Sequence, residues 1–306
     1  MKKKMKAAAL FFMIICTILT GSACGSSGNV LKIKKGQKYE IQYKINDKEY
    51  WNDLSLNTKR ELEVERTLKL SVYVEDMDAA GNIRLKLNYI DYDIYKREDA
   101  NERVFSFKSN EDAVKDALIN VIDRDIKASV DPSFSYVDIN LDKSEYEKII
   151  GNKNLADYTI AKYKEYYDFL FNENTLKEMI LQMFFAFPPV DVKYQDQWIK
   201  KYMFRRSDFS VEFDTYIEFL GDEEGGQKVI FNSVSNEVKY PSEILKFDYS
   251  GNMEGLMNYV SGKGVGQRSK YSFDISGKMY EKYSEEYPLE TAFDLKTEIN
   301  IDVNKM

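Results

Sequence analysis

The stretch LKLSVYVEDMDAAGNIRLKLNY, residues 68–89, decides the fold class of this chain. Apolar side chains occupy every second position on both of its arms, at Leu68, Leu70, Val72, Val74, Ile83, Leu85, Leu87 and Tyr89. A period of two is typical of strands that bury one face. Residues 76–82 between the arms are rich in Asp, Asn and Gly, which favour a turn. The stretch therefore predicts a long β-hairpin.

Similar patterns predict strands on both sides of this hairpin. An earlier strand spans 30–45, and a short strand region spans 134–141. After residue 187 a second hairpin is predicted, with a tip at 221–226. Further strands are predicted at 244–249, 255–262, 267–276 and 291–303. The pattern as a whole predicts a mainly antiparallel sheet.

Helical spacing interrupts the strands in two places. A capping box at Ser109–Asp112 opens a predicted helix that reaches residue 122. The longer helical region, 144–187, carries apolar stripes and a second predicted capping box at Thr175–Glu178, and Pro188 and Pro189 end it. Its sharpest aromatic cluster contains Tyr163, Tyr167, Phe184 and Phe187. These rings either seal a core or line a cavity for an apolar ligand.

The two parts of the chain repeat the same order of elements. Residues 35–39 begin the first part and residues 194–198 begin the second, and each is followed by a hairpin with an acidic, glycine-containing tip. A repeat this long indicates duplication of a sheet unit. We therefore expect an α+β fold of two related curved sheet units, 30–187 and 188–306, with the central helices over one face. The two units either stand apart or form one compact domain.

The N-terminus predicts export and a lipid anchor. Lysines within residues 2–6 precede an apolar run, Ala7–Leu19, that is shorter than the ~20 residues a bilayer requires. This order is typical of a secretory signal peptide, here residues 1–23. Residues 21–24, Gly-Ser-Ala-Cys, resemble a lipobox in which glycine replaces the usual leucine. That resemblance implies lipid on Cys24 at the extracytoplasmic face of the membrane. The alternative is an ordinary signal peptide followed by an incidental cysteine.

Residues 24–29 are small and polar and predict a flexible tether.

Composition excludes several classes of partner, catalytic site and metal site. The signal peptide holds four of the 44 basic residues and none of the 51 acidic ones, so the mature chain would carry a net charge of −11. An acidic surface disfavours nucleic acid as a partner. The chain has no histidine, and Cys24 would be lipidated, so histidine-dependent triads and histidine or thiolate metal sites are excluded. We expect no cofactor and no metal.

Short acidic and glycine motifs have simpler explanations than catalysis. Asp76–Gly81 begins like a calcium loop, but Leu87 stands at the twelfth position, so a hairpin turn explains it better. Gly262–Gly266 lacks the Gly-Lys-Ser/Thr ending of a phosphate loop and indicates a bulge. Asp91 with Asp93, and Glu285 with Glu286, could pair for acid–base work, but a solvated face is the simpler interpretation.

Three short motifs resemble a family of bacterial lipoproteins and secreted proteins that share a domain of unknown function. The motifs are Leu31–Tyr39, the pattern Pro189, Val190, Val192 and Trp198, and the glycines 262, 264 and 266. Gln195 stands where that family has glycine. The family has no agreed activity, so the resemblance implies no catalytic residues. The order of elements is also similar to the LolA-type open barrel, which implies a lipid ligand.

These observations favour a non-enzymatic binding module on the membrane surface. It would bind an apolar small molecule, a lipid or another envelope component. A structural or protein-interaction module is the alternative, and it predicts a solid core with an exposed apolar patch. A carboxylate-dependent hydrolase is the second alternative, and it predicts two acids facing each other across a cleft, about 5–10 Å apart.

Overall fold

The computed structural model describes residues 33–54, 56–98, 103–108, 126–153, 155–188, 192–205, 210–223, 226–239, 245–259, 268–281 and 290–306. Several predictions lie outside these residues. They are the signal peptide, Cys24 and its tether, the helix at 109–122, the glycines 262–266, and Glu285 with Glu286.

The first half of the described chain contributes six strands and three helices. In chain order they are β1 (Lys38–Asp53), β2 (Thr58–Met77), β3 (Ile83–Glu98), β4 (Arg103–Lys108), β5 (Ile126–Val130), β6 (Val137–Asn140), α3 (Ser144–Ile150), α4 (Asp157–Phe171) and α5 (Glu173–Phe184). The second half contributes strands. They are β7 (Gln197–Arg205), β8 (Ser210–Glu223), β9 (Gly226–Lys239), β10 (Leu245–Tyr259), β11 (Arg268–Glu281) and β12 (Glu290–Lys305).

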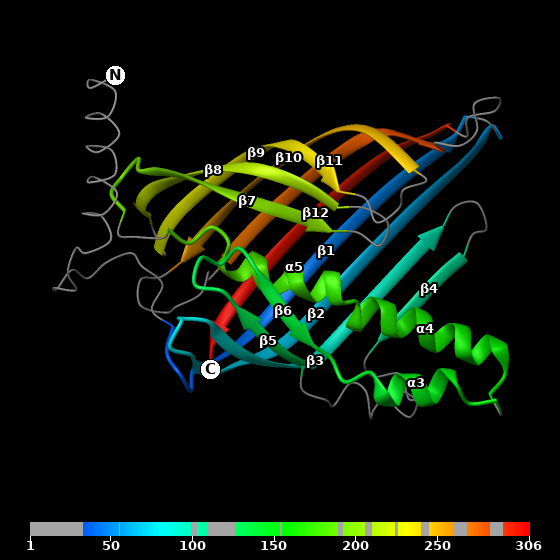
Figure 1. Ribbon diagram of the computed structural model, residues 1–306, viewed down its shortest axis with the longest axis horizontal. Helices are drawn as coiled ribbons and strands as arrows, with labels where there is room; N and C mark the ends of the chain where they lie inside the picture. Colours follow the sequence, from blue (N-terminus) through cyan, green and yellow to red (C-terminus); the bar gives the residue numbers. More distant parts are fainter. Residues whose placement is uncertain are drawn as a thin grey trace, which may run out of the picture.

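The strands form one 12-stranded antiparallel sheet in the order β6-β5-β3-β2-β1-β12-β11-β10-β9-β8-β7, with β4 beside β3. Strand β1 pairs with β2 on one side and with β12 on the other, so the last strand joins the two parts of the chain (Figure 1). The α+β class and the mainly antiparallel sheet are confirmed. The two related sheet units are not, because the sheet runs without a break from β6 to β7.

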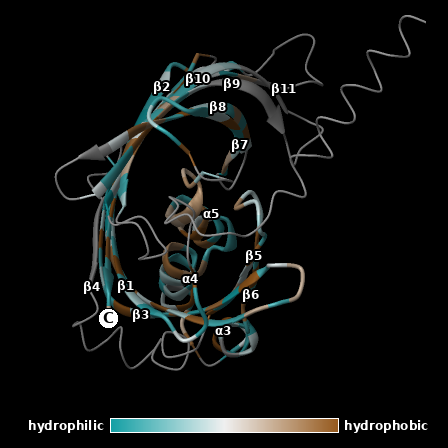
Figure 2. Ribbon diagram, turned by 90° about the vertical axis from the view of Figure 1, so that its left-hand side faces the viewer, coloured by the Kyte–Doolittle hydropathy of each residue, from teal (hydrophilic) through white to brown (hydrophobic). Residues whose placement is uncertain are grey.

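The sheet has one apolar face and one polar face. Along β1, Tyr39, Ile41, Tyr43 and Ile45 are buried while the residues between them are more exposed. The buried face is concave, and Figure 2 shows the sheet curled around α4 and α5. The helices therefore cover the concave face, as expected, and the core lies between them and the strands. The curl brings β7, at one end of the sheet, toward the side that holds β5 and β6.

Tyrosines of the sheet hydrogen-bond to the ends of the helices. Carbonyls in the last turn of a helix have no partner within the helix. The hydroxyl of Tyr89 donates to the carbonyl of Leu170 in α4, at 2.5 Å, and that of Tyr271 donates to the carbonyl of Gln182 in α5, at 2.7 Å. The sheet thus satisfies buried backbone groups as well as covering apolar surface.

The predicted capping box at Thr175–Glu178 is wrong. Helix α5 begins at Glu173, and its N-cap is Asn172, whose Oδ1 accepts a 3.1 Å hydrogen bond from the Thr175 backbone N–H. Glu178 instead faces the sheet, where its carboxylate accepts a hydrogen bond from the backbone N–H of Arg205 on β7. An Asn side chain satisfies an N–H group of the first helical turn as well as Thr does, so Asn172, three residues before Thr175, caps the helix.

Strand β10 corrects a second prediction, because it is one strand where two were expected. The strand continues through Gly255, which pairs with Phe231 on one side and Tyr271 on the other. A Cβ at Gly255 would collide with the Phe231 ring and with the carbonyl of Lys270. Glycine is required there by close packing inside a continuous strand.

The short strand β6 is smaller than predicted. It spans Val137–Asn140 and does not include Phe134 or Tyr136, which belong to the turn between β5 and β6. Phe134 has a positive φ of 56°, which a strand residue does not adopt. This turn helps to form the site described next.

Candidate functional site

The predicted aromatic cluster is packed into the core. Tyr167, Phe184 and Phe187 are buried, and Tyr163 packs against them in part. Phe184 stacks on Phe134 with ring centroids 5.5 Å apart, and Phe187 lies 4.8 Å from the ring of Tyr259. None of the four lines any of the three clefts described below. Their role as the lining of a ligand cavity stays a prediction.

A cleft of about 710 Å³ lies where the curled sheet brings β7 close to the β5–β6 turn. We call it the edge cleft. Five segments supply its apolar walls: the residues before β1, strand β3, the β5–β6 turn, the residues after α5, and strand β7. The wall residues are Ile33, Ile83, Pro132, Phe134, Pro188 and Trp198. Clefts of 300–1,000 Å³ with apolar walls are typical ligand sites. The sequence alone places Phe134 and Trp198 in predicted strands, and Trp198 also in the family motif, but it points to neither as a site residue.

The β5–β6 turn holds Phe134 in a strained conformation at this cleft. The Asp131 carboxylate accepts hydrogen bonds from the backbone N–H groups of Ser133 at 3.1 Å, Ser135 at 2.8 Å and Tyr136 at 2.6 Å, and from the Ser133 hydroxyl. Burial raises the pKa of Asp131, but these hydrogen bonds outweigh it and the pKa lies below its usual value. A bulky residue with positive φ is uncommon and is often found at functional sites.

Lys200 supplies a half-buried charge to the edge cleft. Its Nζ donates to the carbonyls of Phe185 at 3.0 Å and Phe187 at 2.9 Å, in the segment that follows α5. The ammonium also lies 5.5 Å from the Phe134 ring centroid and 5.9 Å from that of Phe185. Burial lowers the pKa of Lys200 to about 8, against a smaller opposing effect of Asp131. The lysine is therefore mostly charged at neutral pH.

Trp198 lies two residues before Lys200 on the same face of β7, because side chains alternate along a strand. Its indole Nε1 is buried and has no hydrogen-bond acceptor among the described residues. Buried polar groups are normally paired, so an orphaned donor at a cleft wall requires an explanation.

A second cleft, of about 770 Å³, lies between α4, the start of α5 and the concave face of β1 to β3. We call it the helix cleft. Asp47 and Arg66 form a buried ion pair on its floor, and the Thr297 hydroxyl donates to Asp47 at 2.7 Å. On its wall the Nζ of Lys96 lies 3.2 Å from Oε1 of Glu165. Each of these charged side chains thus has a partner of opposite charge, although the Nε of Arg66 is buried without an acceptor among the described residues.

Four acids line the helix cleft, two on each side of it. Glu165 and Asp168 lie on α4, Asp47 and Glu49 lie on β1, and Asp47 is bound to Arg66. Burial raises the pKa of Asp168, Glu165 adds to this, and Lys164 opposes it.

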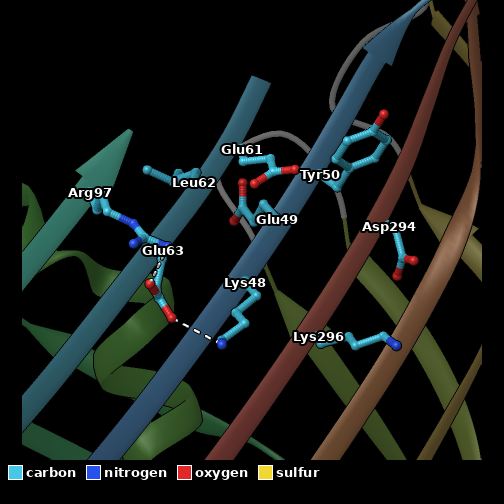
Figure 3. Close-up of a pocket in the computed structure, with 9 residues that line it drawn as sticks. All are labelled: Lys48, Glu49, Tyr50, Glu61, Leu62, Glu63, Arg97, Asp294 and Lys296. Atoms are coloured by element: carbon cyan, nitrogen blue, oxygen red, sulfur yellow. Dashed lines mark ion pairs between the residues drawn. The ribbon is translucent and has the colours of Figure 1, made fainter. Parts of the chain in front are cut away.

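A third, smaller cleft of about 270 Å³ opens on the polar convex face (Figure 3). Its charged walls are largely paired, since the Glu63 carboxylate lies 3.0 Å from Lys48 Nζ and 3.0 Å from Arg97 Nη2. Asp294 and Lys296 of β12 line the other side. Exposed ion pairs of this kind contribute little and are typical of a solvated sheet face.

The structure also places the remaining predicted motifs. Asp76 and Met77 end β2, and Asp78–Gly81 form the turn of the β2–β3 hairpin, where the Asp78 carboxylate accepts hydrogen bonds from the backbone N–H groups of Ala80 and Asn82, each at 2.9 Å. Asp91 and Asp93 are exposed on β3, as alternation predicted. Within the described residues no cluster of three or more Cys, Asp or Glu residues is placed to hold a metal ion. None of the described helices has the length and apolar character that a membrane span needs.

Comparisons with known proteins give no family for this chain. No family model and no curated protein matches it. Among solved structures it is similar to a lipovitellin chain studied for lipid–protein interactions, with 7% identity and a TM-score of 0.49 over 89% of this chain. The match spans 25% of the lipovitellin chain. It is also similar to an outer membrane channel from Pseudomonas putida F1, with 5% identity and a TM-score of 0.22, over 92% of this chain and 100% of the channel. Function is therefore argued from the site itself.

Proposed function

We propose that this protein is a lipid-anchored bacterial envelope protein that binds an apolar ligand in the edge cleft without catalysing a reaction. The single observation that carries the proposal is the edge cleft itself. It has the volume of a small-molecule site, apolar walls drawn from five separate segments, and a polar group at its wall. That combination is what a binding pocket requires.

The strain at Phe134 supports a binding role over a purely structural one. Asp131 holds the turn rigidly, so Phe134 keeps its positive φ and its ring stays on Phe184 at the cleft. Strained residues cost of order 1–3 kcal/mol and persist only where the surroundings fix them. A preorganised wall lowers the entropy that a ligand must lose on binding.

The anchor rests on the sequence alone, and a labelling experiment tests it. Cells that express the chain are fed a radiolabelled fatty acid, and the protein is isolated from the membrane fraction. We expect label on the wild-type protein and none on a Cys24→Ala variant. Equal labelling of both, or an unlabelled wild type, would contradict the anchor and leave the cleft argument unaffected.

Native mass spectrometry tests the ligand. The full-length protein is gently extracted from its own cells, and we expect a mass above that of the lipidated chain. Ser135 is an exposed residue of the cleft mouth, and Ser276 is an exposed residue of the convex face. The Ser135→Trp variant should lose the added mass, while the matched Ser276→Trp variant keeps it. A wild type that carries no added mass would count against the proposal.

An exposed apolar patch favours a second candidate function, contact with another envelope protein. On the convex face Ile199 of β7 pairs directly with Tyr216 of β8, and Ile230 of β9 lies nearby. All three side chains are exposed, Ile199 by 61% and Tyr216 by 59%. Crosslinking in cells with a photoreactive residue at position 216 tests this function. A discrete partner band that an Ile230→Lys change abolishes would support it, and no band would remove it. Ile230 is the residue to change, because Ile199 also lines the edge cleft.

A further inference from the structure

We infer that the edge cleft selects an amphiphile, an apolar chain ending in an anionic group, and that Lys200 and Trp198 bind that group. This inference rests on the proposed function, because it names the class of ligand that the same cleft would take.

The first support is that Lys200 and Trp198 each have an N–H group without an acceptor in the described segments. A lysine ammonium has three N–H donors and no acceptor. Two N–H groups of Lys200 are directed at the carbonyls of Phe185 and Phe187. The indole of Trp198, which is donor only, has no acceptor among the described residues. A ligand group that only accepts hydrogen bonds complements this pair.

The second support is the sign of the charge. Within the part of the chain that the structure describes, no carboxylate forms an ion pair with Lys200. Asp131 is the acid that acts on Lys200 from the facing β5–β6 turn, and its oxygens already accept four hydrogen bonds within that turn. The other groups around the ammonium are the two carbonyls and the rings of Phe134 and Phe185. A partly buried cation without a paired anion favours an anionic ligand.

The third support is the apolar surface beside these donors. Ile33, Ile83, Pro132 and Pro188 line the cleft that also contains Lys200. A small inorganic anion would leave those walls in contact with water, whereas a chain would cover them. The arrangement therefore fits an amphiphile better than a free ion.

A structural role for Lys200 is the competing explanation. Its bonds to Phe185 and Phe187 would tie the segment after α5 to β7 whether or not a ligand is bound. That role predicts changes in stability alone. The inference predicts in addition a preference for anionic ligands that depends on pH and on the charge at position 200.

The test compares four ligands that share one chain: dodecanoate, dodecyl phosphate, dodecanol and dodecylamine. Each is titrated by calorimetry into the full-length chain held in liposomes, with empty liposomes as the blank. At pH 7 we expect an anionic ligand to bind about tenfold more tightly than dodecanol, as a charge-assisted hydrogen bond would give. The tighter binder of dodecanoate and dodecyl phosphate shows whether the cleft prefers a carboxylate or a phosphate group. Dodecylamine should bind more weakly than dodecanol.

Variants separate binding from folding. Lys200→Met should remove the preference for the anion while keeping dodecanol affinity, Lys200→Arg should keep the preference, and Trp198→Phe should reduce it. In the wild type the preference should shrink as pH rises from 7 to 9.5, because Lys200 loses its proton near pH 8. If all four ligands bind equally, the inference is wrong and the proposed function stands. If none binds, both fail.

Discussion

The hydroxyl of Tyr271 in β11 donates a 2.7 Å hydrogen bond to the carbonyl of Gln182 in the last turn of α5. Both groups are buried, and burial holds the pKa of Tyr271 well above its usual value, so the hydroxyl stays protonated as a donor. The carbonyl could not reach water, and without Tyr271 it would lack this bond. The hydrogen bond holds the C-terminal end of α5 against the concave face of the sheet.

Removing this hydroxyl should destabilise the fold. A Tyr271→Phe variant keeps the ring against Phe231, 4.8 Å away, and leaves the Gln182 carbonyl without its donor. We expect a loss of about 1–3 kcal/mol in the free energy of unfolding, measured with urea. Tyr216→Phe on the exposed convex face is the matched control and should change little. Equal effects of the two variants would show that the buried bond contributes nothing.

The buried pair Asp47–Arg66 should respond non-additively to substitution. Asp47→Val alone leaves the Arg66 guanidinium without its partner and should cost about 3–5 kcal/mol. Adding Arg66→Met removes the stranded charge and should recover most of that loss. Urea unfolding of the two single variants and the double variant measures the coupling. Additive losses would contradict the pairing.

Lys200 should make stability rise with pH in the alkaline range. Its pKa is about 8 in the folded protein and ordinarily 10.5, so between these values the unfolded chain binds more protons. Stability then increases as pH rises. Tyrosine ionisation complicates pH values above about 10, so the comparison runs from pH 7 to 9.5. The difference in unfolding free energy between wild type and Lys200→Met should shift in favour of the wild type across this range, and a constant difference would contradict the lowered pKa.

Asp131 should stabilise the β5–β6 turn only while ionised. Its pKa is lower in the folded protein than in the unfolded chain, so the contribution is present above about pH 4 and is lost as pH falls through the folded value. Asp131→Asn should therefore cost about 1 kcal/mol at pH 7. The cost should shrink as pH falls below about 4 and the Asp131 carboxylate takes up a proton, which makes it neutral like asparagine. A cost that does not vary with pH would rule out the carboxylate as its source.

Local patterns predicted most of the strands and the central helices. Alternation at residues 68–89 predicts the β2–β3 hairpin, because buried and more exposed residues alternate along most of both arms. The expectation of two separate strands at 244–249 and 255–262 was wrong. Gly255 lies inside β10, where the Phe231 ring and the Lys270 carbonyl leave no room for a side chain.

The sites could not be predicted, because they depend on contacts between distant segments. Asp47 accepts a hydrogen bond from Thr297, 250 residues away, and no local pattern joins them. The edge cleft combines residues from Ile33 to Lys201 through the curvature of the sheet. The sequence shows Trp198 and Lys200 two residues apart in an alternating strand. It does not show that the indole N–H of Trp198 lacks an acceptor among the residues that the structure describes.

The most direct test of the account uses the chain's two tryptophans, Trp198 at the edge cleft and Trp51 at the far end of β1, where it packs on Phe293. A brominated dodecyl chain is titrated into two full-length variants in liposomes. Trp51→Phe leaves Trp198 as the reporter, and Trp198→Phe leaves Trp51. The account predicts saturable quenching of Trp198 fluorescence, with Trp51 quenched no more than free tryptophan under the same conditions. Equal quenching of the two, or no saturable quenching of Trp198, would contradict ligand binding in the edge cleft.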